Sequence, residues 1–215
     1  MTHPTTRDIA LQADHSALLF IDVQNFSVRR EGGEFKDLPE AETTGKYGHY
    51  FDRLSKIALP NMQKLQKGFR KAGIEVMYTT IESLTLDGRD RSLDYKITGF
   101  NVPKGSWDGK VVDEIAPEGD EIVFPKSSSS VFVSTHIDYV LRNLGISQIV
   151  LCGLLTDQCV ESAVRDACDL NYLVTLVPDA CATYTQTRHD RSLSTIAGYC
   201  RQVNTDDLLA EIASP

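Results

Sequence analysis

The sequence contains a carboxylate, an ammonium and a thiol, each placed just after a short apolar stretch. Asp22 closes the first stretch, Lys126 follows the third and Cys159 lies just beyond the fourth. A thiol beside an acid and a base can attack a carbonyl carbon and form a covalent intermediate. Cys159 also falls in the first turn of an expected helix, where free N–H groups and the helix dipole lower the pKa of a thiol. The three residue types therefore predict nucleophilic catalysis.

Each of the three residues also has a simpler structural interpretation. An Asp at the end of a strand is often only a turn or helix cap, and a Lys beside a run of serines is often a solvated loop residue. A Cys is often a small buried hydrophobe. We give this last interpretation to the other four cysteines, Cys152, Cys168, Cys181 and Cys200. The chemical interpretation requires the three side chains to meet in one place.

Alternating strands and helices are expected to bring them together. Five runs are typical of buried strands, at residues 16–22, 75–80, 121–124, 148–152 and 173–177. Amphipathic helices are expected between them, which predicts an α/β fold: a three-layer α/β/α sandwich with a mainly parallel sheet of about six strands. Open sheets of this kind place their sites at the carboxyl ends of the strands. We therefore expect the acid, the base and the thiol at one edge of the sheet.

Proline and glycine set several expected boundaries. We expect a helix that begins near Pro60 and ends at Gly73, and a fifth strand that Pro178 closes. The polar stretches 25–50 and 81–113 are predicted to be long loops with little local structure. Loops of this length in a compact domain are usually functional.

The composition favours a single reduced domain. The chain has 215 residues, of which 41% are hydrophobic, and we expect one domain over residues 1–215 with 1–14 as a polar N-terminal tail. The net charge of −8 argues against a nucleic-acid partner. No apolar run reaches the length of about 18 residues that a membrane span needs, and residues 1–14 lack the pattern of a secretory signal. Five cysteines, an odd number, favour a cytoplasmic location.

Three segments resemble those of the isochorismatase-like cysteine hydrolases. Residues 18–25, Leu-Leu-Phe-Ile-Asp-Val-Gln-Asn, are similar to the strand motif that ends in the catalytic Asp of that family. Residues 126–132, Lys-Ser-Ser-Ser-Ser-Val-Phe, are similar to its catalytic Lys segment. Residues 153–160, Gly-Leu-Leu-Thr-Asp-Gln-Cys-Val, are similar to its nucleophile loop. The superfamily includes nicotinamidases and N-carbamoylsarcosine, ureidoacrylate and biuret amidohydrolases, and the resemblance extends over nearly the whole chain.

The resemblance implies a hydrolase that cleaves a C–N bond of a small amide, ureido or carbamoyl compound through a thioester. Cys159 is expected to attack the carbonyl, Asp22 to move the proton, and Lys126 to hold Asp22 and favour the thiolate. The resemblance also implies an oxyanion hole formed by the N–H groups of Leu155 and Cys159, and a cis peptide between Leu154 and Leu155. It implies no cofactor, and a homodimer or homotetramer.

The segments that bind a metal in nicotinamidases lack the corresponding ligands here. Those enzymes use an Asp-x-His pair and a further His, whereas this chain has Gly-His-Tyr at residues 48–50 and Thr-Ile-Glu-Ser at residues 80–83. We therefore expect no catalytic metal. Side chains on the same predicted edge are candidate substrate contacts: Phe26, Glu82, Trp107, Tyr184 and His189. Glu82 is of particular interest because a carboxylate accepts N–H groups from a urea-like substrate and repels an anionic one.

Two other functions remain open at this point. True isochorismatases hydrolyse a vinyl ether and often lack the cysteine, so Asp22 and Lys126 alone are compatible with that reaction. A non-catalytic binding module on the same fold is a third reading, although such a module has no need of all three residues. The expected partner is a small-molecule amide or ureido substrate, with no nucleic acid and no membrane.

Overall fold

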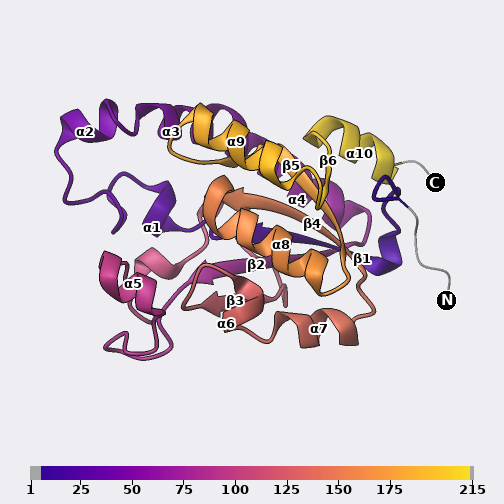
Figure 1. The fold of residues 1–215 in the computed structure, drawn as a ribbon, viewed down its shortest axis with the longest axis horizontal. Helices are drawn as coiled ribbons and strands as arrows, with labels where there is room; N and C mark the ends of the chain where they lie inside the picture. The colour runs from indigo at the N-terminus through magenta and orange to yellow at the C-terminus, as the bar shows by residue number, and fades with distance from the viewer. Residues whose placement is uncertain (1–5, 214–215) are drawn as a thin grey trace.

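A parallel sheet of six strands forms the centre of the computed structural model, which describes residues 6–213 (Figure 1). The strand order is β3-β2-β1-β4-β5-β6, and each neighbouring pair is parallel. The strands are β1 (Ser16–Ile21), β2 (Glu75–Ile81), β3 (Val123–Lys126), β4 (Gln148–Leu154), β5 (Leu173–Ala182) and β6 (Arg201–Gln202). The predicted α/β/α sandwich is confirmed.

The two central strands, β1 and β4, are buried along their whole length. Their sequences are nearly continuous apolar runs, the pattern of parallel strands that are covered by helices on both faces. The strands pair from Ser16 with Gln148 to Ile21 with Gly153. Gly153 has φ +129°, and a Cβ there would lie 2.2 Å from the backbone oxygen of Ile21. Glycine is therefore required where β4 ends against β1.

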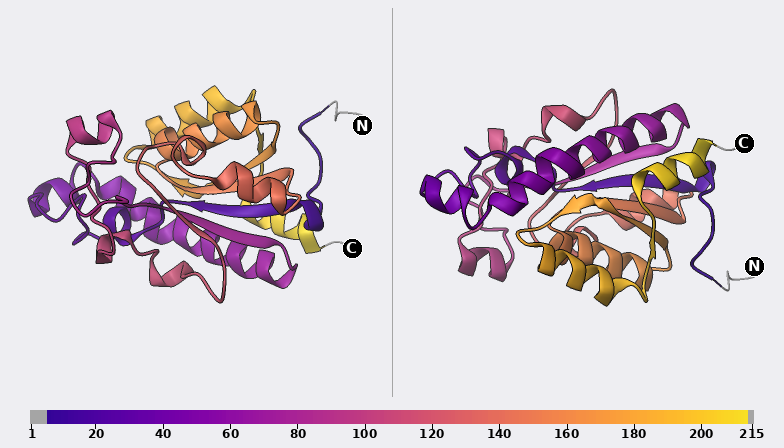
Figure 2. Two further views of the ribbon diagram at one scale, coloured as in Figure 1. Left: turned by 90° about the horizontal axis from the view of Figure 1, so that it is seen from below. Right: turned by 90° about the horizontal axis from the view of Figure 1, so that it is seen from above.

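Helices cover both faces of the sheet, as the two views in Figure 2 show. One face carries α4 (Leu59–Lys71) and α10 (Thr205–Ala213), which contact each other. The other face carries α6 (Val131–Ser134), α7 (Ile137–Asn143), α8 (Glu161–Asp169) and α9 (Gln186–Ile196). Among residues 6–213, no helix is both long and apolar enough to cross a membrane.

The strand order creates a switch point between β1 and β4. The chain leaves β1 towards β2 and β3, and then crosses to the other side of β1 to form β4, β5 and β6. In open parallel sheets, the crevice at such a point lies outside the carboxyl ends of the strands and holds the ligand. The short helices α1 (Asn25–Val28), α2 (Glu40–Thr44) and α5 (Leu93–Thr98) lie beyond these strand ends (Figure 1).

Two proline-based boundaries differ from the prediction. Strand β5 continues through Pro178 because its register with β4 shifts between Leu151 and Gly153, and the proline falls in the unpaired bulge where no ladder N–H is needed. The helix expected to begin at Pro60 instead continues from α3 (Gly48–Arg53) through the π-turn η2 (Leu54–Ala58) into α4. A π-turn suits a following proline, which has no N–H to donate and clashes with the carbonyl four residues earlier.

The end of the helix at Gly73 agrees with expectation, and the long polar stretches contain more structure than predicted. Gly73 ends α4 with φ +69°. The stretches at 25–50 and 81–113 include the short helices α1, α2 and α5 and the turn η3 (Trp107–Gly109). Residues 1–5 of the expected polar tail lie outside the described residues, while Leu11 and Gln12 donate N–H groups to Glu211 and Gln148.

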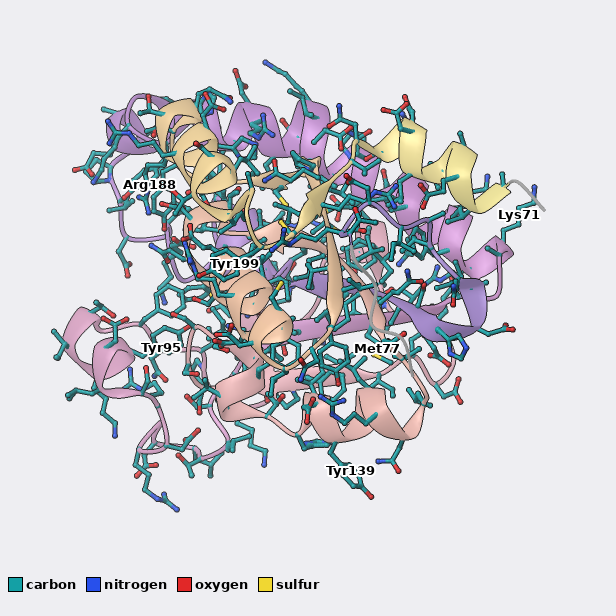
Figure 3. The ribbon with its side chains drawn as sticks, turned by 45° about the vertical axis from the view of Figure 1, so that its right-hand side comes forward. Lys71, Met77, Tyr95, Tyr139, Arg188 and Tyr199 are labelled. Carbon is teal, nitrogen blue, oxygen red and sulfur yellow. The ribbon has the colours of Figure 1, made fainter. Side chains whose placement is uncertain are left out.

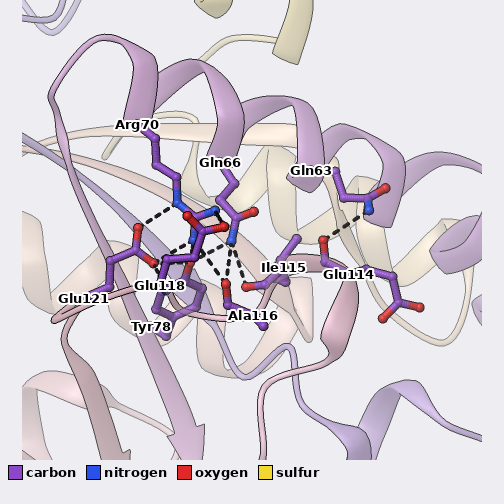
Figure 4. A network of polar contacts seen from close by, with 9 residues as sticks. All are labelled: Gln63, Gln66, Arg70, Tyr78, Glu114, Ile115, Ala116, Glu118 and Glu121. Atoms are coloured by element: carbon purple, nitrogen blue, oxygen red, sulfur yellow. Dashed lines mark hydrogen bonds and ion pairs between the residues drawn. The ribbon is translucent and has the colours of Figure 1, made fainter.

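A polar network holds the segment that leads into β3 against α4 (Figure 4). Arg70 of α4 donates to both carboxylate oxygens of Glu121, at 2.7 and 2.8 Å. Gln66, also on α4, donates to the hydroxyl of Tyr78 and to the carbonyl of Ile115, both at 2.8 Å. Because β3 carries Lys126 at its end, this network also fixes the position of that lysine.

Candidate active site

The structure brings Asp22, Lys126 and Cys159 together beside one cavity, which Asp22 and Cys159 line and beneath which Lys126 is buried. The Nζ of Lys126 lies 2.8 Å from Oδ2 of Asp22 and donates to Sγ of Cys159 at 3.4 Å. The three residues are 2%, 0% and 6% exposed, respectively. An acid, an ammonium and a thiol from three separate strand ends therefore form one buried cluster.

Asp22 follows β1 in the left-handed region of backbone conformation, with φ +53°. Few residues tolerate this region, and Asp is among those that do. Strand β2 holds it there: the N–H of Asp22 donates to the carbonyl of Thr79 at 3.1 Å, and the hydroxyl of Thr79 donates to Oδ1 at 2.6 Å. The carboxylate is thus fixed by the neighbouring strand and by the lysine.

Lys126 is the last residue of β3. It was expected to follow the strand, but β3 begins and ends two residues later than predicted. Its Nζ also donates to the carbonyl of Ser128 at 2.9 Å. Burial acts to lower the pKa of Lys126, but the negative charges of Asp22 and Cys159 outweigh it and hold that pKa above its ordinary value. The lysine therefore stays charged and fully paired in the interior.

Cys159 lies in the π-turn η5 (Thr156–Val160), which leads directly into α8. The peptide between Leu154 and Leu155 at the start of this loop is cis, as the resemblance predicted. Burial raises the pKa of the Cys159 thiol to about 12, while Lys126 opposes this shift and Asp22 adds to it. The lowered thiol pKa expected from a helix N-terminus is therefore not found, because the sulfur is buried. A thiol in this state needs a base before it can attack.

The carboxylate of Asp22 offers an oxygen for that proton. Oδ2 is buried and, among residues 6–213, accepts no well-directed hydrogen bond, although the Nζ of Lys126 lies 2.8 Å away. The ion pair is therefore close but not in line with a lone pair of Oδ2. The charge of Asp22 and its hydrogen bond to Cys159 both favour the protonated thiol. A buried carboxylate oxygen without a hydrogen-bond donor is a suitable acceptor for the proton of the thiol.

The cavity above this cluster has a volume of about 570 Å³. Four aromatic residues, Phe26, Tyr95, Phe100 and Tyr184, line it together with polar side chains and glycines. Phe26 contacts Phe100 edge to face at 4.6 Å, and the hydroxyl of Tyr95 lies 3.9 Å from the sulfur of Cys159. Figure 3 shows Tyr95 at the same end of the molecule as Arg188, and Lys71 at the other end. A volume of this size holds a small organic substrate.

Two of the five candidate substrate contacts, Phe26 and Tyr184, line the cavity, and three do not. Glu82 faces a separate depression that Thr80 also lines, whereas Ile81 between them faces the cavity. Side chains along a strand alternate between the two faces, so Glu82 points away from the cluster. It accepts the N–H of Gly105 at 3.0 Å instead.

Trp107 and His189 also lie outside the cavity lining. The Trp107 side chain is about half exposed, and its backbone oxygen accepts from Asn25 at 2.9 Å. His189 is buried between the hydroxyl of Thr156 and the guanidinium of Arg53, each at 2.9 Å. Burial and the charge of Arg53 lower its pKa to about 4. The neutral ring of His189 therefore supports the nucleophile loop through its hydrogen bond with Thr156.

Several residues of the cavity wall were not predicted from the sequence, and Tyr95 and Glu34 are the two that matter most for its chemistry. Glu34 lies in the stretch at 25–50, and its Oε1 accepts a hydrogen bond from the hydroxyl of Tyr184. Burial raises the pKa of Glu34 to about 7, although hydrogen bonds from Tyr184 and Ser27 oppose the shift. No local pattern marks either residue, because Glu34 lies in an irregular turn and Tyr95 in the short helix α5, and only the tertiary fold brings them to the cavity. Within the described part of the chain, no His, Cys, Asp or Glu side chains are grouped as a metal site.

Comparison with known proteins shows several matches. The isochorismatase domain family matches residues 16–207. A ureidoacrylate amidohydrolase of Rhizobium rhizogenes is 31% identical over 188 residues, which cover 80% of this chain and 72% of that protein. A cysteine hydrolase structure from Pseudomonas syringae aligns with a TM-score of 0.82 and 22% identity over 100% of this chain and 99% of the other. The N-carbamoylsarcosine amidase of Thermoplasma acidophilum aligns with a TM-score of 0.69 and 26% identity, covering 89% and 96% of the two chains.

Proposed function

Since this chain belongs to the isochorismatase domain family, we propose that it hydrolyses a C–N bond of a small amide, ureido or carbamoyl compound through a thioester on Cys159. One observation carries the proposal: the ammonium of Lys126 lies 2.8 Å from Asp22 and 3.4 Å from the sulfur of Cys159, and both of these partners line a cavity. The relatives named ureidoacrylate amidohydrolase support C–N hydrolysis as the reaction. Ureidoacrylate combines a ureido group with a carboxylate, and the proposal concerns the first of these groups.

In the first half of the reaction, Asp22 takes the proton of the Cys159 thiol and the sulfur attacks the substrate carbonyl carbon. The C–N bond of the tetrahedral intermediate then breaks. Asp22 returns the proton to the leaving nitrogen, which departs as ammonia or an amine. Lys126 remains charged throughout. Its ammonium group orients Asp22 and stabilises the thiolate that forms transiently.

In the second half, water replaces the amine. Asp22 takes a proton from the water while the water oxygen attacks the thioester carbon. The C–S bond then breaks. The carboxylic or carbamic acid leaves, and the proton returns to the sulfur. The sum is one water consumed for each C–N bond cleaved, with Asp22, Lys126 and Cys159 restored.

The negative oxygen that forms in both halves needs hydrogen-bond donors. We assign this role to the backbone N–H groups of Leu155 and Cys159, two residues that line the cavity. The carbonyl of Leu155 accepts the N–H groups of Gln158 and Val160, at 3.0 and 3.3 Å. These two bonds support the assignment because they fix the loop from Leu155 to Cys159 before substrate arrives.

Ammonia release from a panel of amides, ureides and carbamoyl amino acids tests the proposal. Cys159→Ala is expected to lose roughly 10³-fold or more of the activity, because the nucleophile has no substitute. Cys168→Ala is the matched control, since that thiol is half-buried and does not line the cavity. Ammonia release that survives the Cys159 substitution would contradict the proposal. Pyruvate release from isochorismate without amide turnover would assign vinyl ether hydrolysis instead, and tight binding without any turnover would assign a binding module.

A further inference from the structure

The charged side chains that line the cavity are all acidic. Among the described residues they are Asp22, Glu34 and Asp94, and no Lys, Arg or His is present in the lining. Lys126 lies below the floor and is paired with Asp22, so these two charges offset each other. Asp94 is exposed on α5. Glu34 is therefore the acidic group of the wall that is neither exposed to solvent, as Asp94 is, nor used by the candidate chemistry, as Asp22 is.

Glu34 is held in a defined position. The hydroxyl of Tyr184 donates to its Oε1, and Ser27 provides a second side-chain hydrogen bond. The next residue, Phe35, is 1% exposed and packs against Tyr50 and other aromatic rings. The backbone N–H of Glu34 donates to the carbonyl of Phe26 at 3.3 Å. The carboxylate is thus fixed on both sides rather than free to turn into solvent.

No cation compensates Glu34 within residues 6–213, where no Lys, Arg or His lies within ion-pair distance of it. The guanidinium of Arg188 lies over the ring of Tyr184 at 4.9 Å and pairs with Asp157 at 2.5 Å. A partly buried carboxylate that lacks a cation favours a ligand that brings N–H groups. For the same reason it opposes a ligand that brings a second carboxylate.

We propose that Glu34, positioned by Tyr184 and Ser27, selects substrates by charge: it accepts an N–H group of the substrate outside the bond that is cleaved, and it excludes substrates with a carboxylate at that place. The preferred class is then an amide or ureido compound whose other end is a neutral N–H donor or an ammonium group. This inference rests on the proposed function of the same cavity. It transfers to Glu34 the role that the sequence suggested for Glu82.

Alkylation of Cys159 by two small reagents tests the inference without requiring turnover. Iodoacetamide carries an amide where iodoacetate carries a carboxylate, and the two reagents are otherwise alike. Both react with the same thiolate, so the ratio of their alkylation rates is independent of the thiol pKa. The ratio is measured for the Cys159 peptide by mass spectrometry at pH 8, where Glu34, with its pKa raised to about 7, is largely ionised. Glu34→Gln is expected to raise the iodoacetate rate relative to iodoacetamide by roughly three- to tenfold, the effect of one nearby charge in a partly hydrated cavity.

Glu31→Gln is the matched control, because Glu31 lies on the same segment, is exposed and does not line the cavity. It should leave the rate ratio unchanged. Tyr184→Phe, which removes the hydroxyl that holds Glu34, should shift the ratio in the same direction as Glu34→Gln. A ratio for Glu34→Gln equal to that of Glu31→Gln overturns the inference.

A turnover assay separates this inference from the function on which it rests. Succinamide, succinamate and 3-aminopropanamide are amides of similar length whose far ends are neutral, anionic and cationic. The wild-type protein should release ammonia from succinamide and 3-aminopropanamide with a higher kcat/KM than from succinamate. Glu34→Gln should reduce this difference in kcat/KM, mainly by lowering the KM for succinamate. Cys159-dependent release with equal kcat/KM for all three overturns the charge selection alone. A shifted alkylation ratio without any Cys159-dependent release supports charge selection and rejects the amidohydrolase proposal.

Discussion

Substituting Lys126 by Met tests the energetics of the buried cluster. Met has a similar length but no charge, so the carboxylate of Asp22 stays in the interior without its counter-ion. At a separation of 2.8 Å and an effective dielectric constant of about 20, the attraction between the two charges is about 6 kcal/mol. While the pair is intact, the cost of removing both charged groups from water offsets much of this attraction. Removing one partner typically costs about 3–5 kcal/mol because the other charge is left unpaired.

Urea unfolding at pH 7, followed by circular dichroism, measures this loss as a change in the free energy of unfolding. The double variant Asp22→Asn with Lys126→Met should recover about 2 kcal/mol or more of the summed losses, because it leaves no buried charge. Lys67→Met, at an exposed position of α4, is the control and should change stability by less than about 0.5 kcal/mol. A loss below about 1 kcal/mol for Lys126→Met, or additive losses in the double variant, would show that Asp22 and Lys126 are not energetically coupled in this way.

Three further changes have expected outcomes that urea unfolding can check. The pKa of Glu34 is raised from 4.5 to about 7, so the stability that its proton contributes is fully present below pH 4.5 and is lost as the pH rises through about 7. Glu34→Gln should therefore be more stable than the wild type at pH 8, by up to about 3 kcal/mol, and equally stable near pH 4; an equal difference at both pH values would contradict this. Gly153→Ala should lose about 3 kcal/mol or more, because its Cβ would lie 2.2 Å from the oxygen of Ile21; wild-type stability would show that β4 can shift there. Gln66→Leu should lose about 1–3 kcal/mol, since the carbonyl of Ile115 loses its donor and Tyr78 keeps only the longer bond from Arg70; no loss would mean that water replaces the amide.

The floor of the site could be predicted from sequence because it lies at strand ends. The apolar runs of β1 and β4 are strong local signals, and a parallel sheet aligns their carboxyl ends. Asp22 and the loop that carries Cys159 follow from this rule without knowledge of the tertiary structure. The thiol pKa was predicted in the wrong direction, because the helix N-terminus is visible in sequence whereas the burial that outweighs it is not.

The walls of the site could not be predicted in the same way. Glu82 directly follows a strand, but the alternation of side chains turns it away from the cavity while Ile81 faces it. Glu34 lies in an irregular turn and Tyr95 in the short helix α5, and the position of both depends on distant partners. Tyr184, for example, lies 150 residues from Glu34 in sequence and yet donates a hydrogen bond to it.

The reversal of strand order between β1 and β4 has a consequence for how such a protein can diversify. Asp22 and the nucleophile loop are joined through backbone hydrogen bonds of adjacent strands, so the separation of acid and sulfur does not depend on the surrounding irregular segments. Those segments, at 25–50 and 81–113, contribute recognition groups such as Glu34 and Tyr95. Reactivity and selectivity are therefore encoded in different stretches of chain. Replacing the two segments as cassettes should alter which compounds are accepted while the same bond-breaking machinery is retained.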